Sequence, residues 1–148
     1  AHQRAGRLDL AVAAYRRALT VGGASGELYN NLGLAYQDLG RLDEAEAALA
    51  KAITSSAGDS EAAINLKMLQ LRRAGLESVA LFEEMTGAFP HHATLWRSLV
   101  SEYAARGRLD MAIAACRRVI ELDPTDQQAR DNLNVLLQKQ RGQEGISD

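Results

Sequence analysis

Apolar residues recur every three to four positions along most of this chain, which is the spacing of one face of an α-helix. Residues 26–39 carry such a stripe, which includes Tyr29, Leu32 and Tyr36, and residues 42–54 carry another, which includes Leu49. Val, Ile and Thr, which favour strands, are sparse and scattered. The pattern therefore predicts an all-α protein built from short amphipathic helices.

These predicted helices are organised as an internal repeat. The sequence Gly-Arg-Leu-Asp occurs at residues 6–9, 40–43 and 107–110, and a degraded copy lies at 74–80. The first two copies are 34 residues apart, and the third follows after 67, one residue short of two such periods. A period of this size is typical of a helical repeat protein.

The sequence between the repeats predicts helix ends and tight turns. Gly40 suits a helix C-cap, where a left-handed backbone is least costly for glycine. Asp43 and Glu44 would then stand in the first turn of the next helix, at its positive end. Pro124 would end the helix that precedes it. Each unit is thus predicted to be two antiparallel helices, which must stack on their neighbours to bury their apolar faces.

Residues 26–59 resemble the tetratricopeptide repeat (TPR) family. This copy has the family's residues at the family's spacing, namely Tyr29, Leu32, Gly33, Tyr36, Gly40, Ala45, Leu49 and Ala52. Residues 93–126 repeat the series with Trp96, Leu99, Tyr103, Gly107, Ala112, Ala115, Val119 and Pro124. The resemblance implies a right-handed superhelical α-solenoid of stacked antiparallel helix pairs.

The repeat pattern divides residues 1–140 into one TPR-like domain. Its parts are a partial repeat (1–25) with a helix over about 7–21, full repeats at 26–59 and 93–126, a degenerate repeat at 60–92, and a closing helix at 127–140. Residues 141–148 are polar and contain glycine, so we expect a flexible tail. Gly33, Ala45 and Ala52 are expected where helices approach closely, and the aromatic residues, Trp96 included, are expected to be scaffold.

The degenerate repeat departs from the pattern in its first helix. Lys67 and Gln70 replace the family's small residue and Tyr. Two apolar stripes run along opposite sides of this helix, one with Ala62, Leu66 and Leu69 and the other with Ile64, Met68 and Leu71. An ordinary half-buried helix has one such stripe. We favour burial of the second stripe by a neighbouring repeat, and the alternative is that it lines a groove.

In the TPR family, exposed positions on the first helix of each repeat line a concave groove that binds a partner. Carried over to this chain, the resemblance implies a groove lined by Asn30, Asn31, Leu34, Gln37, Ile64, Asn65, Met68, Leu71, Arg72, Arg97, Ser98, Ser101, Asn132 and Val135. Four of these, Asn31, Asn65, Ser98 and Asn132, occupy one repeated position. Asn both donates and accepts, so such a ladder could bind a peptide backbone, as in a glycosyltransferase of the family. The alternative is that each Asn bonds within its own repeat.

Charged recognition has less support in the predicted groove. The family's two-carboxylate clamp needs basic or amide groups where this chain has Glu27, Glu61 and Thr94. Arg72 and Arg97 are left as candidates for a single acidic contact.

Composition and motifs argue against several other functions. The net charge of −2 does not suggest a nucleic-acid binder. His91 and His92 share a turn without a third ligand, so no metal site is expected. Cys116 lies on an apolar stripe, which predicts a buried small side chain rather than a nucleophile. No phosphate-binding loop or membrane-length apolar run is present, so we expect no enzyme activity, no cofactor and no membrane insertion.

The resulting hypothesis is a scaffold that binds a peptide or protein in the groove. One alternative is a structural module that forms homo-oligomers through an open N-terminal end, where Leu8, Val12 and Tyr15 would lack a covering helix. Another is the substrate-docking TPR region of a larger enzyme, such as a glycosyltransferase. The compartment cannot be read from the sequence, and a soluble, cytoplasmic location is the expectation we favour.

Overall fold

The computed structural model describes residues 2–23, 25–55 and 60–147, and their regular structure is entirely helical, as predicted. The helices are α1 (His2–Gly22), α2 (Gly26–Asp38), α3 (Leu42–Ser55), α4 (Ser60–Arg73), α5 (Ser78–Ala88), α6 (Ala93–Ala105), α7 (Leu109–Leu122) and α8 (Gln127–Ser147). The chain divides into two compact units, residues 1–74 (unit 1) and 75–148 (unit 2). Each is described by itself.

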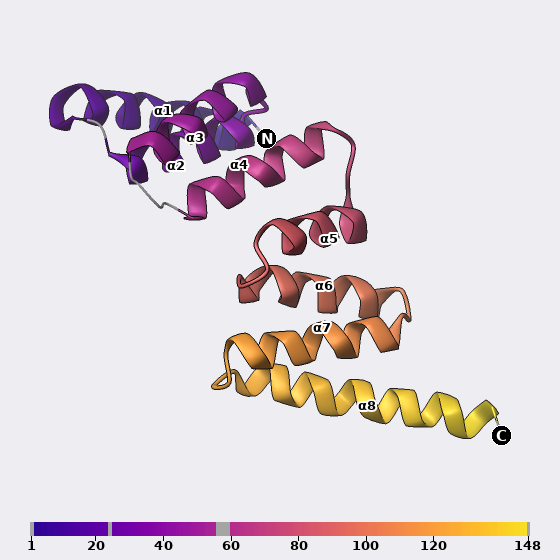
Figure 1. The fold of residues 1–148 in the computed structure, drawn as a ribbon. Helices are drawn as coiled ribbons and strands as arrows, with labels where there is room; N and C mark the ends of the chain where they lie inside the picture. The colour runs from indigo at the N-terminus through magenta and orange to yellow at the C-terminus, as the bar shows by residue number, and fades with distance from the viewer. Residues whose placement is uncertain (1, 24, 56–59, 148) are drawn as a thin grey trace. The chain divides into compact units, whose positions relative to one another are not determined.

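Unit 1 contains the antiparallel pair α2 and α3, joined by a turn at Gly40 (Figure 1). Gly40 has φ +79°, and the next amide, of Arg41, donates to the carbonyl of Tyr36 at 2.9 Å. This bond satisfies a carbonyl that the end of α2 would otherwise leave unpaired. The predicted glycine C-cap is therefore confirmed.

The core of unit 1 centres on Leu49, whose side chain is fully buried. A Cβ atom placed on Gly33 would lie 2.7 Å from Leu49 Cγ and 3.3 Å from the carbonyl oxygen of Ala45. Because real Cβ atoms essentially never come under 3.0 Å, α2 and α3 can approach this closely only with glycine at position 33. The expectation that small residues mark close helix contacts is confirmed here.

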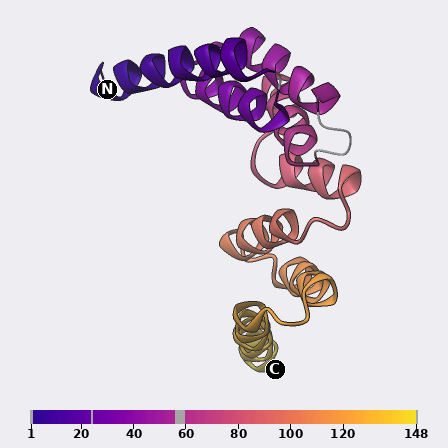
Figure 2. The same cartoon turned by 90° about the vertical axis from the view of Figure 1, so that its left-hand side faces the viewer.

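Unit 2 repeats this arrangement in α6 and α7. Gly107 has φ +70°, and the amide of Arg108 donates to the carbonyl of Tyr103 at 2.9 Å, as at Gly40. Figures 1 and 2 both show α6, α7 and α8 side by side in chain order. Leu99 and Val119 are almost fully buried in the core that these helices share.

The start of α1 differs from the prediction. A turn at Gly6 and a helix from about residue 7 were expected, but α1 runs without a break from His2 to Gly22. Gly6 is not among the residues with positive φ. The turns at Gly40 and Gly107 reverse the chain so that two apolar faces can meet, whereas the good helix formers Gln3, Arg4 and Ala5 favour continuation of the helix at Gly6. A glycine inside a helix costs only about 1 kcal/mol, so α1 can continue through Gly6.

The last helix is also longer than predicted. A closing helix was expected to end at 140, and α8 continues to Ser147. The good helix formers Gln140, Gln143 and Glu144 offset two interior glycines in this stretch. The flexibility expected of residues 141–148 stays a prediction, and Asp148 lies outside the described residues.

The degenerate repeat at 60–92 contains the boundary between the two units, which falls between Ala74 and Gly75. Gly75 has φ +94° and Ser78 has φ +53°. A non-glycine residue in this region is uncommon and strained. The backbone is thus irregular where the repeat is one residue short.

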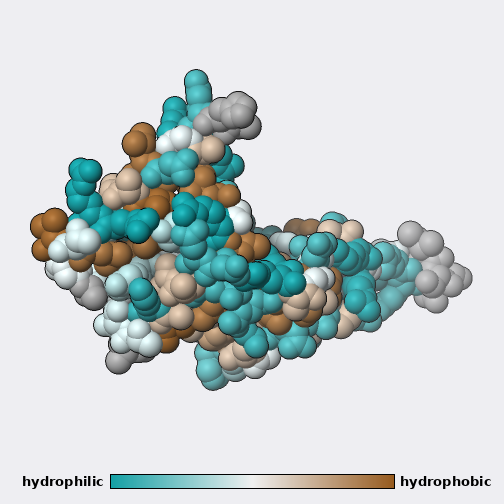
Figure 3. All heavy atoms as spheres, turned by 90° about the horizontal axis from the view of Figure 1, so that it is seen from above, coloured by the Kyte–Doolittle hydropathy of each residue, from teal (hydrophilic) through white to brown (hydrophobic). Residues whose placement is uncertain are grey.

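Hydrophilic and hydrophobic residues intermingle on the face of the molecule shown in Figure 3. Among the described residues, the exposed large hydrophobic side chains are Leu10 and Val21 on α1, Met111 on α7 and Val135 on α8. No helix in the described ranges is long and apolar enough to cross a membrane.

Candidate partner-binding surfaces

In unit 1, an asparagine pair connects the first helices of two successive repeats. The Asn65 side-chain amide on α4 donates to the side-chain oxygen of Asn30 on α2 at 3.0 Å. Asn30 is only 6% exposed, so this bond satisfies a buried polar group. Asn65 therefore already serves the protein's own packing, through a bond between repeats rather than within one.

The other expected groove residues of unit 1 differ in exposure. Ile64 is buried, and its role in this structure is packing. The side chains of Asn31, Leu34, Gln37, Met68 and Leu71 are half-buried, and that of Arg72 is exposed. The second apolar stripe of α4 is thus partly core and partly surface.

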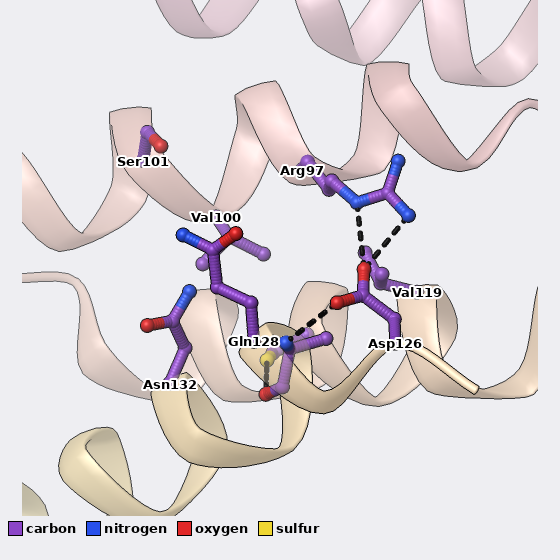
Figure 4. Close-up of a pocket in the computed structure, with 9 residues that line it drawn as sticks. Arg97, Val100, Ser101, Val119, Asp126, Gln128 and Asn132 are labelled. Atoms are coloured by element: carbon purple, nitrogen blue, oxygen red, sulfur yellow. Dashed lines mark hydrogen bonds and ion pairs between the residues drawn. The ribbon is translucent and has the colours of Figure 1, made fainter. Parts of the chain in front are cut away.

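In unit 2, the expected groove positions surround a small pocket. The pocket has a volume of about 140 Å³. It is lined by Arg97, Val100 and Ser101 of α6, Cys116 and Val119 of α7, and Asp126, Gln128, Ala129 and Asn132 at the start of α8. We call it the α6–α8 pocket. In Figure 4 the side chains of Gln128 and Asn132 extend from α8 toward α6. Arg97, Ser101 and Asn132, predicted from the repeat, are thereby brought together.

The positive charge of Arg97 is already paired inside the α6–α8 pocket. Its guanidinium lies 2.7 Å from Asp126 (Figure 4) and 3.4 Å from Asp123, both in the segment between α7 and α8. The sequence suggested Arg97 as a contact for an acidic partner. In this structure the chain's own carboxylates occupy that position.

Asp126 has a second role as the N-terminal cap of α8. Its carboxylate accepts the backbone N–H of Ala129 at 3.0 Å, and this bond, followed by the one from Arg97, lowers the pKa of the carboxyl below its ordinary value of 3.8. Sequence analysis missed this residue. An Asp just before a helix that follows a proline is an N-cap signal that could have identified it.

Acid sensitivity of unit 2 is the expected consequence. Because folding lowers the Asp126 pKa, the stability that this group contributes is complete above about pH 4 and is lost as the pH falls through the lowered folded-state value. Asp126→Asn keeps a capping side chain and removes the titration. The urea midpoint, followed by fluorescence of the single tryptophan, Trp96, should fall more in the wild type than in the variant between about pH 5 and pH 3. Equal falls would contradict the role given to Asp126.

Cys116 lies at the inner side of the α6–α8 pocket and is 1% exposed. Its thiol donates to the carbonyl of Ala129 at 3.1 Å, and burial raises the pKa of the thiol above its ordinary value. A protonated, buried thiol is a poor nucleophile. The prediction that Cys116 is a buried packing residue is confirmed.

The remaining expected residues of unit 2 lie in different environments. The Ser98 hydroxyl donates to the carbonyl of Thr94 in its own helix at 3.2 Å, whereas Val135 is 49% exposed. Trp96 donates its indole N–H to the carbonyl of Pro90 at 2.9 Å, as expected of a scaffold residue. Across the described ranges, no three His, Cys, Asp or Glu side chains are grouped to hold a metal ion.

Larger pockets lie beside the second helices of the repeats and were not predicted, and two of them are lined by aromatic residues. The α1–α3 pocket of unit 1, about 340 Å³ in volume, is lined by Arg16, Leu19, Thr20, Tyr29, Leu32, Tyr36, Glu44, Ala47, Ala48 and Lys51. The α6–α7 pocket of unit 2, about 360 Å³, is lined by Trp96, Tyr103, Met111, Ala114, Ala115, Arg118 and Glu121.

Comparison with known families agrees with this geometry. A family model described as tetratricopeptide repeat matches residues 1–60 and 76–127, well over half of the chain. The chain belongs to the tetratricopeptide repeat family. The TPR match leaves out residues 61–75, which hold most of α4. The interruption thus coincides with the degenerate repeat.

Solved structures with a similar fold include TPR-like chains of the protein MamA. MamA of strain AMB-1 is 20% identical, with a TM-score of 0.53 over 97% of this chain and 79% of that chain. A MamA segment, residues 41 to the end, from Desulfovibrio magneticus RS-1 is 17% identical, with a TM-score of 0.51 over 98% of this chain and 82% of that chain. These similarities confirm the predicted α-solenoid fold class. No curated protein sequence matches the chain.

Proposed function

We propose that this TPR chain binds extended peptide segments of a protein partner along the first helices of its repeats, and that it does so as a scaffold without catalytic activity. Family membership supports the general role in protein interaction. The single observation that carries the finer proposal is the α6–α8 pocket. Arg97, Ser101 and Asn132, which the resemblance to the TPR family assigned to a groove, lie together there.

The chemistry of that pocket favours recognition of a peptide backbone. Arg97 is held by two carboxylates, so the polar groups left to meet a ligand are the hydroxyl of Ser101 and the amides of Gln128 and Asn132. Amides pair with backbone N–H and C=O groups whatever the sequence of the peptide. In unit 1, Asn31 is the member of the ladder whose side chain makes no hydrogen bond to a described residue.

Substitution of Asn132 tests the groove of unit 2. Peptides selected from a displayed random library against the wild-type chain provide a defined probe, and fluorescence anisotropy gives its Kd. Asn132→Ala should weaken binding by about twofold to tenfold, the loss expected for one or two hydrogen bonds. Asn31→Ala should have an effect of similar size if the peptide also reaches unit 1.

A matched control lies two residues away on the same helix. Asn134 is exposed and does not line the α6–α8 pocket. Asn134→Ala should leave the Kd and the helix content unchanged. Full binding by Asn132→Ala, or equal losses in Asn132→Ala and Asn134→Ala, would refute the groove proposal.

Self-association is a second candidate function. Val12, which was expected to lack a covering helix, is only 5% exposed and packs in the core of unit 1. The exposure of Leu10 (72%) and Val21 (85%) on α1 favours this candidate instead. Apolar side chains this exposed on one helix can be covered by a second copy of the chain. Light scattering across a dilution series tests it, because a monomeric mass at every concentration would exclude it. A docking role within a larger enzyme is the other alternative, and the full-length gene would decide it.

A further inference from the structure

The α1–α3 pocket of unit 1 has an aromatic floor and a positively charged rim. Tyr29 and Tyr36 of α2 line it together with Ala47 of α3, whose side chain is exposed, and the Arg41 guanidinium lies 4.8 Å from the centre of the Tyr36 ring. Arg16 of α1 and Lys51 of α3 stand at the edge, with the Lys51 ammonium 5.8 Å from the centre of the Tyr29 ring.

Glu44, the acidic residue that lines this pocket, does not neutralise the charges of Arg16 and Lys51. Glu44 is held by Arg41, with both carboxylate oxygens 2.7 Å from guanidinium nitrogens. Within the described ranges, neither Arg16 nor Lys51 takes part in an ion pair. The charged side chains facing the pocket therefore leave two positive charges uncompensated, in a chain whose net charge is −2.

The α6–α7 pocket of unit 2 is built from repeat-equivalent residues. Tyr36, Ala47 and Lys51 correspond to Tyr103, Ala114 and Arg118, each 67 residues further on. In unit 2, however, Arg118 is paired with Glu121 at 2.9 Å. This second pocket therefore has no free cation at the position of Lys51.

In unit 2, Glu83 precedes Tyr103 by 20 residues, as Arg16 precedes Tyr36 in unit 1, and its carboxylate accepts a hydrogen bond from the Tyr103 hydroxyl at 2.9 Å. In unit 2 the chain thus places its own carboxylate at the tyrosine of the pocket. In unit 1 the corresponding Tyr36 hydroxyl has no hydrogen-bond partner among the described residues, and a cation, Arg16, lines the pocket with it.

We propose that the α1–α3 pocket binds an acidic peptide by placing an Asp or Glu side chain at the Tyr36 hydroxyl, between Arg16 and Lys51. The carboxylate occupies the position that Glu83 supplies internally in unit 2. A neighbouring apolar side chain of the peptide lies on Tyr29 and Ala47, where aromatic and methyl surface is exposed to it. This surface is formed beside second helices, so it is separate from the groove proposed above and does not depend on it.

An NMR titration with a blocked tetrapeptide of alternating Leu and Glu, and with its Leu and Gln counterpart, tests the proposal. The Glu peptide should shift the amide signals of Tyr36, Ala47 and Lys51, and the Gln peptide should bind more weakly. Lys51→Ala and Arg16→Ala should each weaken binding of the Glu peptide by about twofold to fivefold, the usual range for a partly exposed ion pair. Both side chains are exposed, so the variants are expected to fold.

The repeat supplies a matched control and a sharper variant. Arg118→Ala removes the equivalent cation of unit 2 and should leave the binding unchanged. Arg16→Glu should abolish it, because the new carboxylate can take the place at Tyr36 that Glu83 takes at Tyr103. Equal affinity for the Glu and Gln peptides, signal shifts confined to unit 2 or to the groove, or unaltered binding by Arg16→Glu would each overturn the proposal.

Discussion

Leu49→Ala is expected to lower the free energy of unfolding of unit 1 by about 2–5 kcal/mol, the range measured for buried leucines. Leu49 is completely buried, and its branched end fills the space against Gly33 on the facing helix. Because Gly33 has no side chain that could move into the cavity, little of the lost contact can be recovered. Hydrogen exchange of the amides in α2 and α3 measures the effect in unit 1 separately from unit 2.

Leu10→Ala is the control for this substitution. It makes the same chemical change in the same unit, at a side chain that is 72% exposed. Substitutions at such surface positions usually change stability by less than about 0.5 kcal/mol. Similar losses in the two variants would mean that Leu49 is not the packing centre that its burial indicates.

The parts of the fold that could be predicted from sequence are those fixed by local rules. Gly40 and Gly107 recur at the ends of amphipathic segments, and their left-handed backbones follow from what glycine alone allows at low cost. Gly33 was expected from the resemblance to the TPR family, which has a small residue at this position. Both kinds of position depend on residues within the same helix pair.

The wrong helix boundaries arise from context that a local motif does not contain. Residues 6–9 match 40–43, but the good helix formers Gln3, Arg4 and Ala5 precede Gly6, and α1 continues through it. In the same way, the glycines after residue 140 suggested that the last helix ends there, but with good helix formers beside them α8 continues to Ser147.

The sequence predicted which residues of the candidate site lie together, but it did not predict how their charges are paired. The resemblance to the TPR family assigns one face of each first helix to the groove, which is why Arg97, Ser101 and Asn132 were expected together. The pairing of Arg97 with Asp126 connects residues 29 apart in the sequence through the turn before α8. Periodicity does not contain that information, and the same holds for the bond between Asn65 and Asn30.

The two proposed surfaces differ in charge, and this difference separates their partners. The α6–α8 pocket has neutralised its arginine and offers amides and a hydroxyl, which suits a peptide backbone. The α1–α3 pocket is lined by Arg16 and Lys51, which form no ion pair with a described residue, and by two tyrosines, which suits an acidic and apolar segment. Loss of binding on raising the salt concentration should therefore be stronger for the second surface than for the first.

Gly33→Ala is expected to destabilise the wild-type chain and to stabilise the Leu49→Ala variant. In the wild type the new Cβ would lie 2.7 Å from Leu49 Cγ and 2.9 Å from Leu49 Cδ2. Overpacking of this kind costs about 1–3 kcal/mol, which outweighs the gain of up to about 1 kcal/mol from replacing a helical glycine. In the Leu49→Ala background both clashing atoms are gone, and the nearest remaining atom is the Ala45 oxygen at 3.3 Å. The higher helix propensity of alanine and the partial filling of the cavity left by Leu49→Ala should then raise the free energy of unfolding.

This reversal of sign is measured by a double-mutant cycle, with hydrogen exchange of α2 and α3 as the readout. Gly6→Ala in α1 is the control, because no atom lies within 4 Å of the Cβ it would add. It should stabilise both backgrounds equally, by about 0.5–1 kcal/mol, through helix propensity alone. If Gly33→Ala shifts the two backgrounds by the same amount, then the contact between Gly33 and Leu49 does not set the distance between α2 and α3. Another interaction would then have to explain why glycine stands at position 33.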